Sequence, residues 1–168
     1  MRIALSNDHA GFSLKPFVAG LLADLGHEII DVGTENESPV DFPLMTQRVT
    51  RLVTSGEADR GILVCGTGVG AAIAANKVPG IRAAVIHDTY VARQGVEHDD
   101  VNVGCLGAWV IGQRIAEDVI TAFLEAEFST DPDFRRRVAQ LDSMESAAAS
   151  IRPKQPARRE GGLRRAAD

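Results

Sequence analysis

Short apolar runs alternate with helical patterns along the chain, and this alternation restricts the fold more than any other feature of the sequence. After an apolar run at residues 3–5, apolar residues recur on one helix face until Gly26 ends the pattern. The repeated pairing predicts strands at 3–5, 28–32, 61–65, 82–86 and 102–106. It predicts helices at 14–25, 43–55, 69–77, 89–94 and around 116–123. This order favours an α/β fold: a parallel sheet of about five strands with right-handed crossovers and helices on both faces.

A last helix is predicted to begin at Asp131 and Pro132, because an N-cap aspartate and a proline in the first turn are typical of helix starts. Its apolar residues share one side, beside a run of three arginines. The apolar residues are Val138, Leu141 and Met144. We expect this C-terminal helical arm to pack on another surface, and in so small a chain we expect a second copy to provide it.

The chain of 168 residues suits one α/β domain of ordinary size, which we place at 1–148, followed by a basic tail at 149–168. Residues 151–168 hold six basic and two acidic side chains, several prolines and glycines and few apolar residues, so we expect disorder there. The net charge of the whole chain is −5, so the body is acidic. An acidic body argues against nucleic acid as the main partner.

The sequence also bears on the compartment of the protein. No apolar run approaches the ~18 residues that cross a bilayer, and the N-terminus turns polar after a few apolar residues. We therefore expect a cytoplasmic protein without membrane contact. Cys65 and Cys105 lie on separate predicted strands without metal-ligand spacing, so we expect neither a disulfide nor a metal site.

A glycine-rich turn stands where a buried strand is predicted to end and a helix to begin. It reads Cys65-Gly66-Thr67-Gly68-Val69-Gly70. Glycines let the backbone approach a ligand closely, and free amides at a helix start stabilise negative charge. The spacing is neither the dinucleotide fingerprint nor a nucleotide phosphate loop. The motif alone leaves open an anion site or a tight structural turn.

Three further groups combine a chemical interpretation with a structural one. A thiol at a helix N-terminus has a lowered pKa, so Cys65 is either a base or a small buried hydrophobe, whereas Cys105 is expected to be inert. Asp8 and His9 follow the first strand and could transfer protons and bind anions, or Asp8 could cap a helix. Residues 98–102, which begin with His98 and Asp99, are either a further candidate site group or, as the local pattern alone favours, an acidic polar loop.

Taken together, these segments resemble the ribose-5-phosphate isomerase B and galactose-6-phosphate isomerase family. The matching stretches are 7–12, 41–43, 61–70, 73–77, 80–83 and 98–103. The resemblance implies a Rossmann-like sheet, no metal or organic cofactor, and a homodimer, with a tetramer as a further assembly, whose active sites combine residues of two subunits.

The resemblance also implies roles for individual residues. Cys65 would move a proton between C1 and C2 of a sugar phosphate, and Thr67 and His98, the latter from the partner subunit, would assist ring opening. Asp8 would contact the reacting oxygens, and His9, Arg136 and Arg137 would bind the phosphate. The remaining expected substrate-binding residues are Phe42, Gly66, Gly68, Val69, Gly70 and Asp99.

Four positions depart from the family pattern. Ala71 stands where some members have a glutamate base, which leaves Cys65 as the candidate. Phe42 replaces a tyrosine, and Trp109 stands where many members have an arginine. In the last helix a second usual arginine is either replaced by Asp133 or shifted by an insertion. We expect ribose 5-phosphate as substrate. The alternatives are erythrulose 4-phosphate, galactose 6-phosphate, allose 6-phosphate, or a non-catalytic protein that binds a sugar phosphate; a nucleotide-dependent enzyme is disfavoured by the missing fingerprint.

Overall fold

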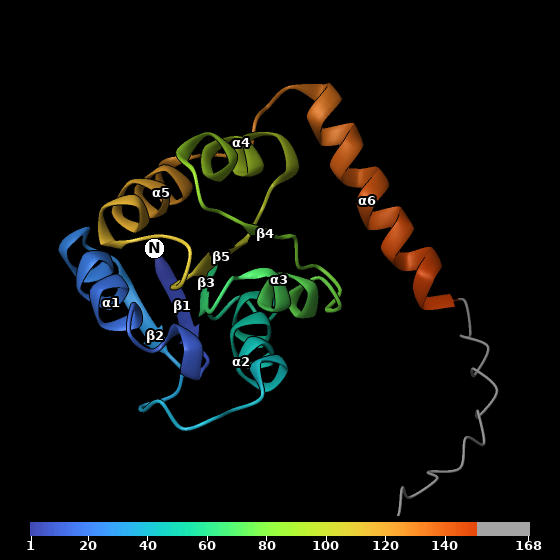
Figure 1. Cartoon of the computed structure of the whole chain (residues 1–168). Coiled ribbons are helices and arrows are strands. Elements are labelled where there is room, and N and C mark those ends of the chain that lie inside the picture. The colour runs from blue at the N-terminus through green and yellow to red at the C-terminus, as the bar shows by residue number, and fades with distance from the viewer. Residues whose placement is uncertain (151–168) are drawn as a thin grey trace, which may run out of the picture.

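A sheet of five parallel strands lies at the centre of the molecule (Figure 1). The computed structural model describes the backbone of residues 1–150 and the side chains of residues 1–147. The strands are β1 (Arg2–Asn7), β2 (Glu28–Asp31), β3 (Arg60–Cys65), β4 (Ala83–Val85) and β5 (Val103–Gly107). Their order is β2-β1-β3-β5-β4. The predicted parallel α/β fold is confirmed, and each strand lies within three residues of its predicted bounds.

Helices cover both faces of this sheet. They are α1 (Lys15–Asp24), α2 (Phe42–Thr54), α3 (Val69–Ala75), α4 (Thr89–Asp99), α5 (Gln113–Glu125) and α6 (Pro132–Ser150), with a 3-10 turn η1 (His9–Gly11) after β1. Helices α1, α4 and α5 pack on one face and α2 and α3 on the other. The two faces arise because the direction of the crossover reverses between β1, β2 and β3.

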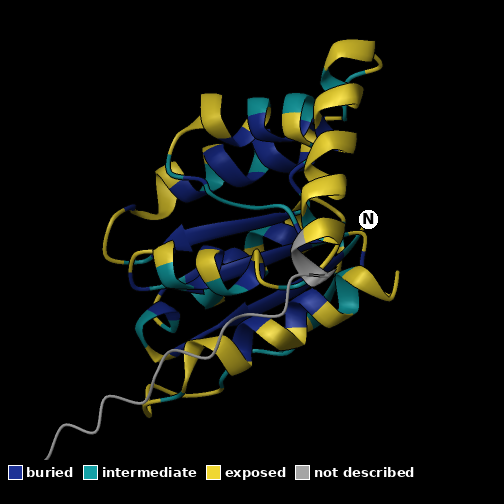
Figure 2. Cartoon of the chain, turned by 90° about the vertical axis from the view of Figure 1, so that its right-hand side faces the viewer, coloured by how far each residue is buried: buried dark blue, intermediate teal, exposed yellow. Residues whose placement is uncertain are grey.

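Alternation along β1 divides the core into two layers. Ile3 and Leu5 pack beneath α1 and α5, whereas Ala4 faces α2 and α3. The central strands β1, β3 and β5 are almost wholly buried, whereas the outer strands β2 and β4 are at most partly buried. Exposed residues line the outer sides of the helices (Figure 2). Because strands of this kind are covered on both faces, their ends at the sheet edge are the parts that remain open to ligands.

Helix α4 is longer than its sequence pattern predicts. The prediction ended it at Gln94 and read residues 98–102 as a loop, but the helix continues to Asp99 and ends at Asp100 with φ 50°. Gly95 lies inside the helix because Val101 packs against it: a Cβ at Gly95 would lie 3.3 Å from Val101 Cγ2. His98 and Asp99 therefore belong to the last helical turn, which corrects the loop prediction.

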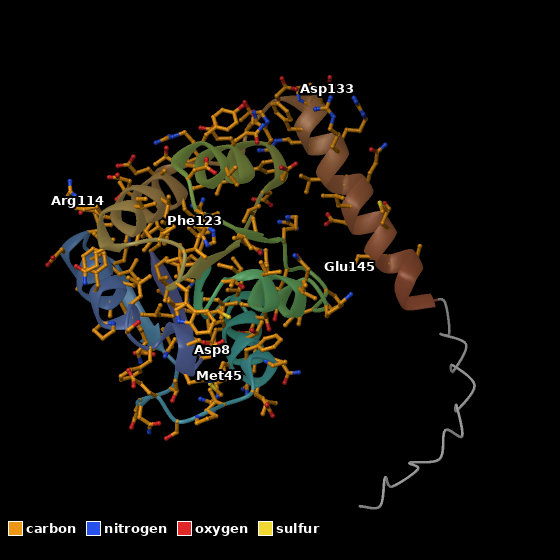
Figure 3. All side chains as sticks on the ribbon, viewed as in Figure 1. Asp8, Met45, Arg114, Phe123, Asp133 and Glu145 are labelled. Carbon is orange, nitrogen blue, oxygen red and sulfur yellow. The ribbon has the colours of Figure 1, made fainter. Side chains whose placement is uncertain are left out.

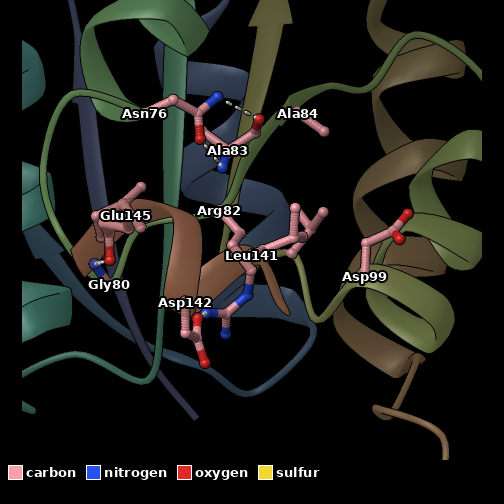
Figure 4. A pocket seen from close by; sticks show the side chains of 11 residues that line it. Asn76, Gly80, Arg82, Ala83, Ala84, Asp99, Leu141, Asp142 and Glu145 are labelled. Carbon is pink, nitrogen blue, oxygen red and sulfur yellow. Dashed lines mark hydrogen bonds and ion pairs between the residues drawn. The ribbon is translucent and has the colours of Figure 1, made fainter. Parts of the chain in front are cut away.

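Helix α6 projects from the body as the predicted arm (Figure 1). The carboxylate of Asp131 accepts a hydrogen bond from the amide of Asp133 at 2.7 Å, in agreement with the predicted helix start. The amide of Gly80 donates to Glu145 at 2.9 Å, and the guanidinium of Arg82 lies 3.5 Å from Asp142 (Figure 4).

A cavity of about 380 Å³ lies between α6 and the segment that leads into β4. The boundary proposed at residue 148 falls inside α6, which runs to Ser150. The rest of the predicted tail lies outside the described residues.

Candidate active site

The carboxyl ends of β1 and β3 meet at the point where the chain changes direction across the sheet. In this pair Asn7 lies opposite Val64, so Asp8 follows β1 beside Cys65, the last residue of β3. Ligands of open α/β sheets bind at this kind of switch point, outside the carboxyl ends of the strands. The topology therefore brings together the carboxylate and the thiol that the sequence singles out.

Backbone contacts fix Asp8 in place. Its amide donates to the Val64 carbonyl at 3.2 Å, and its Oδ1 accepts from the Gly11 amide at 2.9 Å. A Cβ at Gly11 would lie only 1.9 Å from the Val64 oxygen, so η1 rests directly on the backbone of β3. Asp8 is thus a helix cap, as one sequence interpretation expected, and it also lies next to Cys65.

The environment of Cys65 opposes the expected activation of its thiol. Burial raises the pKa of the Cys65 thiol above its ordinary value, and so does the hydrogen bond that the thiol donates to the Asp8 carboxylate. The backbone amides of Gly68 and Thr67 act in the other direction and lower this pKa. The glycine-rich turn therefore lowers the pKa of Cys65 as expected, but burial and Asp8 outweigh it. The net pKa of the thiol is raised, so the expected lowering was wrong.

The glycine-rich turn rests on the end of β5. Gly68 has φ 77°, in the left-handed region that favours glycine, and a Cβ there would lie 3.2 Å from the Cys105 carbonyl oxygen. The amide of Gly107 donates to His87 Nε2 at 3.0 Å, directly beneath Thr67. At the start of α3 the Val69 amide donates to Thr67 Oγ1 at 3.4 Å, and the amides of Thr67 and Gly68 face the Cys65 sulfur, where they favour negative charge.

Two aromatic rings flank this turn. A Cβ at Gly70 would lie 3.2 Å from the ring of Phe42, and a Cβ at Gly66 would lie 2.8 Å from the indole of Trp109. A small cavity of about 10 Å³ is lined by Phe42 together with Asp8, Met45 and Cys65. Asp8 and Met45 are labelled side by side in Figure 3. The sequence predicted the place of Phe42 but not the contact between Trp109 and Gly66.

The predicted phosphate ligand His9 stands at the same edge of the sheet. Its Nδ1 accepts a hydrogen bond from the Val40 amide at 3.3 Å, which ties η1 to the loop before α2. The ring therefore keeps a nitrogen, Nε2, for a ligand at the carboxyl edge.

The predicted residues of α4 and α6 form a second group, on the side of the sheet where the strands begin. They are His98, Asp99, Arg136 and Arg137. Helix α4 begins after β4 and returns to the amino end of β5, so its eleven residues carry His98 about 16 Å away from the carboxyl edge. Asp133, at the start of α6, lies at the far end of the molecule from Asp8 (Figure 3). One described subunit does not bring His98, Asp99, Arg136 and Arg137 to Cys65.

Within the second group, ring contacts order the side chains. The imidazole of His98 stacks on Phe134, with ring centroids 3.8 Å apart. The guanidinium of Arg137 lies 5.5 Å from the centroid of the same phenyl ring, and Arg136 forms an ion pair with Asp133. Sequence reasoning missed Phe134; its place one turn before the apolar stripe of α6 is the signal that could have indicated it.

Comparison with known proteins decides the family. The pattern of the family described as Ribose/Galactose Isomerase matches residues 3–141, which is most of the chain. The chain belongs to the ribose/galactose isomerase family. The family resemblance predicted from the sequence is thereby confirmed.

Three relatives from the ribose/galactose isomerase comparisons illustrate the similarity. Ribose-5-phosphate isomerase B of Escherichia coli is 42% identical over 127 residues, covering 76% of this chain and 85% of that protein. D-erythrulose-4-phosphate isomerase of Pectobacterium atrosepticum is 39% identical over 130 residues, with 76% and 85% covered. The solved structure of Clostridium thermocellum ribose-5-phosphate isomerase B has a TM-score of 0.85 at 44% identity, covering 88% and 99%. The Rossmann-like fold expected from the family is confirmed by this last comparison.

The described part of the chain has neither a membrane-spanning helix nor a cluster of metal-binding side chains. Within residues 1–150 no helix combines the length and apolar character needed to cross a membrane. In the same part of the chain, no three side chains among His, Cys, Asp and Glu are grouped so that they could hold a metal ion.

Proposed function

We propose that the protein is an aldose–ketose isomerase that converts ribose 5-phosphate into ribulose 5-phosphate through an enediolate. The observation that carries the proposal is the placement of the Cys65 thiol between the Asp8 carboxylate and the amides of a glycine-rich turn. Such a turn supplies fixed donors for an oxyanion, and family membership points to this class of reaction.

The proposed chemistry needs a base and a site for negative charge. Cys65 as thiolate removes the proton from the carbon next to the carbonyl and returns it to the neighbouring carbon. The amides of Gly66, Gly68, Val69 and Gly70 hold the oxyanion of the enediolate, an interaction whose loss costs an enzyme about 10²-fold or more in rate. Thr67 lies in the same turn and assists ring opening, and Asp8 contacts the reacting oxygens. Phe42 offers an aromatic face to the sugar.

Activation of the thiol follows from its neighbours. Because the Asp8 carboxylate lies beside the Cys65 thiol and lines the same small cavity, it is the group placed to take the thiol proton when substrate fills the site. The amides of Thr67 and Gly68 then stabilise the thiolate, because both already lower its pKa. No metal or organic cofactor enters this proposal.

We further propose a homodimer in which each site is completed by the partner subunit. His98 and the arginines of α6 lie at the far edge of their own sheet, so a second subunit is needed to bring them to Cys65. His98 would then assist ring opening, Arg136 and Arg137 would bind the phosphate together with His9, and Asp99 would contact the substrate. The exposed side chains Leu141 and Met144 give α6 an apolar face for the partner.

The proposed compartment is the cytoplasm. Both cysteines are free thiols, which suits a reducing environment and the use of Cys65 as a base.

The first test is direct. The purified protein is incubated with ribose 5-phosphate while ketose formation is followed, beside the Cys65→Ala variant. Rates for the unchanged protein that do not exceed those of Cys65→Ala would reject the proposal for this sugar. A panel with erythrulose 4-phosphate and galactose 6-phosphate then identifies the preferred chain length.

A second candidate function is a sugar-phosphate binder without catalysis; the observation in its favour is that Cys65 is partly buried beside the Asp8 carboxylate, a place that favours the neutral thiol. Exchange of solvent deuterium into C2 of the sugar separates the two. An isomerase incorporates deuterium through the enediolate, whereas a binder is stabilised by the ligand without any exchange.

A further inference from the structure

Trp109 occupies an unusual place for a large apolar side chain. It lies in the turn after β5, and 74% of its surface is exposed. Single exposed hydrophobic residues are common and by themselves indicate nothing. The position of this ring is more informative, because its edge is in contact with Gly66, the first glycine of the turn beside Cys65.

The backbone holds Trp109 firmly to the same turn. The amide of Ala108 donates to the Cys65 carbonyl at 2.8 Å, and the amide of Trp109 donates to the Gly66 carbonyl at 3.0 Å. Val110 and Ile111 donate back to the Gly107 carbonyl at 2.9 and 3.0 Å, and the Ile111 side chain is buried. The backbone of Trp109 is therefore held in place, although most of the indole surface is exposed to water.

A second ring stands at the other end of the glycine-rich turn. Phe42, 39% exposed, begins α2 and contacts Gly70. The turn thus has an aromatic ring at its first glycine and another at its third. Ligand sites are commonly lined by aromatic side chains, with a few polar groups that fix the orientation of the ligand.

We infer that the indole of Trp109 is a wall of the substrate site that contacts the carbon chain of the sugar phosphate and limits its length. The inference rests on the proposed function and adds a residue that determines specificity. The amides hold the reacting end of the sugar, Phe42 covers one side, and Trp109 closes the other. A bulky, anchored ring favours chains of four or five carbons, because a sixth carbon has to displace it.

Trp109 is the sole tryptophan of the chain, so its fluorescence reports on this position alone. The first experiment titrates full-length Cys65→Ala protein with ribose 5-phosphate, erythrulose 4-phosphate and galactose 6-phosphate. Binding of a sugar phosphate against the ring is expected to change the emission saturably and to protect the indole from acrylamide quenching. Unchanged emission and quenching at sugar concentrations that saturate the unchanged enzyme would overturn the inference.

The second experiment measures kcat and KM for the same sugars with Trp109→Ala and Trp109→Phe. For Trp109→Ala we expect KM for the preferred sugar to rise about tenfold, and the ratio of hexose to pentose kcat/KM to rise about tenfold, since one methylene changes specificity by this order. Trp109→Phe should keep most of the preference. The matched control is Leu25→Ala, an apolar residue 40% exposed at the end of α1, which should change neither quantity.

The outcomes separate this inference from the proposed function. If Trp109→Ala isomerises the sugar normally, with the same KM and the same preference for chain length, Trp109 does not line the substrate site. The proposed isomerase function would then still stand. Saturable changes in Trp109 emission without turnover of any sugar by the unchanged protein would support the wall and refute the isomerase. Absence of both binding and turnover for all three sugar phosphates would overturn the two together.

Discussion

The imidazole of His98 stacks on the phenyl ring of Phe134, with centroids 3.8 Å apart and planes inclined by 14°. The contact joins the last turn of α4 to the first turn of α6, and both turns lie away from Cys65 of the same subunit. The stacking fixes the plane of the His98 ring. The pairing of these two rings therefore supports the proposed division of one site between two subunits.

Mixed dimers test that division. Cys65→Ala and His98→Ala proteins should each lose about 10²-fold or more in activity, the usual contribution of an acid or base. Co-expressed at equal levels, they should recover about a quarter of the wild-type activity, because half of randomly paired dimers contain one intact site. Recovery is measured on purified mixtures against each variant alone. Mixtures no more active than their parents would show that the site is not shared.

The pKa of Cys65 can be tested by alkylation. The carboxylate of Asp8 is one cause of the raised pKa, so Asp8→Asn should lower it, because removal of a nearby negative charge favours the thiolate. Rates of iodoacetamide modification against pH should give a midpoint above about 8.5 in the unchanged protein, the ordinary value for cysteine. Cys105 is fully buried and should not interfere, and Cys65→Ala confirms this. Equal midpoints with and without Asp8 would contradict the assignment.

Two glycine-to-alanine changes should have opposite effects on stability. At Gly11 a methyl group would collide with the Val64 carbonyl, so Gly11→Ala should reduce the free energy of unfolding by about 3 kcal/mol or more. Gly20, inside α1, has no atom within 4 Å of a new Cβ, so Gly20→Ala should raise it by about 0.5–1 kcal/mol. Urea unfolding measures both. A stable Gly11→Ala protein would show that η1 does not rest on β3 as described.

His87 should make stability depend on pH. Burial lowers the pKa of His87, and its Nε2 accepts a hydrogen bond that a protonated ring cannot accept. The unfolded state therefore binds more protons, and the contribution of His87 is present above about pH 6.5 and is lost as the pH falls through its lowered pKa. In His87→Gln, whose amide oxygen replaces the acceptor without titrating, unfolding free energies at pH 7 and pH 5 should differ less than in the unchanged protein. An identical pH dependence in both proteins would exclude this role.

The fold could be predicted because each strand and helix carries its own periodic pattern, and the parallel order of the strands follows from their alternation. The placement of Asp8 beside Cys65 could also be predicted, since both follow strands whose carboxyl ends share an edge. The end of α4 could not, because Gly95 resembles a helix stop until its contact with Val101 is known.

Features that arise between distant segments escaped the sequence. The pKa of Cys65 depends on its burial and on Asp8, and neither is visible in the local pattern of the glycine-rich turn. The contact between Trp109 and Gly66 is set by the pairing of β3 with β5, whose ends lie side by side with Cys65 opposite Gly107. Local motifs therefore indicated candidate groups, whereas the sheet order determined which of them lie together.

The contact of Gly11 with the backbone of β3 has a consequence for evolution. No side chain stands between the two segments, so substitutions there cannot adjust the position of Asp8 or Cys65 gradually. Phe42 and Trp109 lie beside the glycine-rich turn and do not take part in the contact between Gly11 and β3, so they can be substituted without disturbing that contact. Under the proposed function, we therefore expect single substitutions at Phe42 or Trp109 to change the preferred substrate while Asp8 and Cys65 keep their positions.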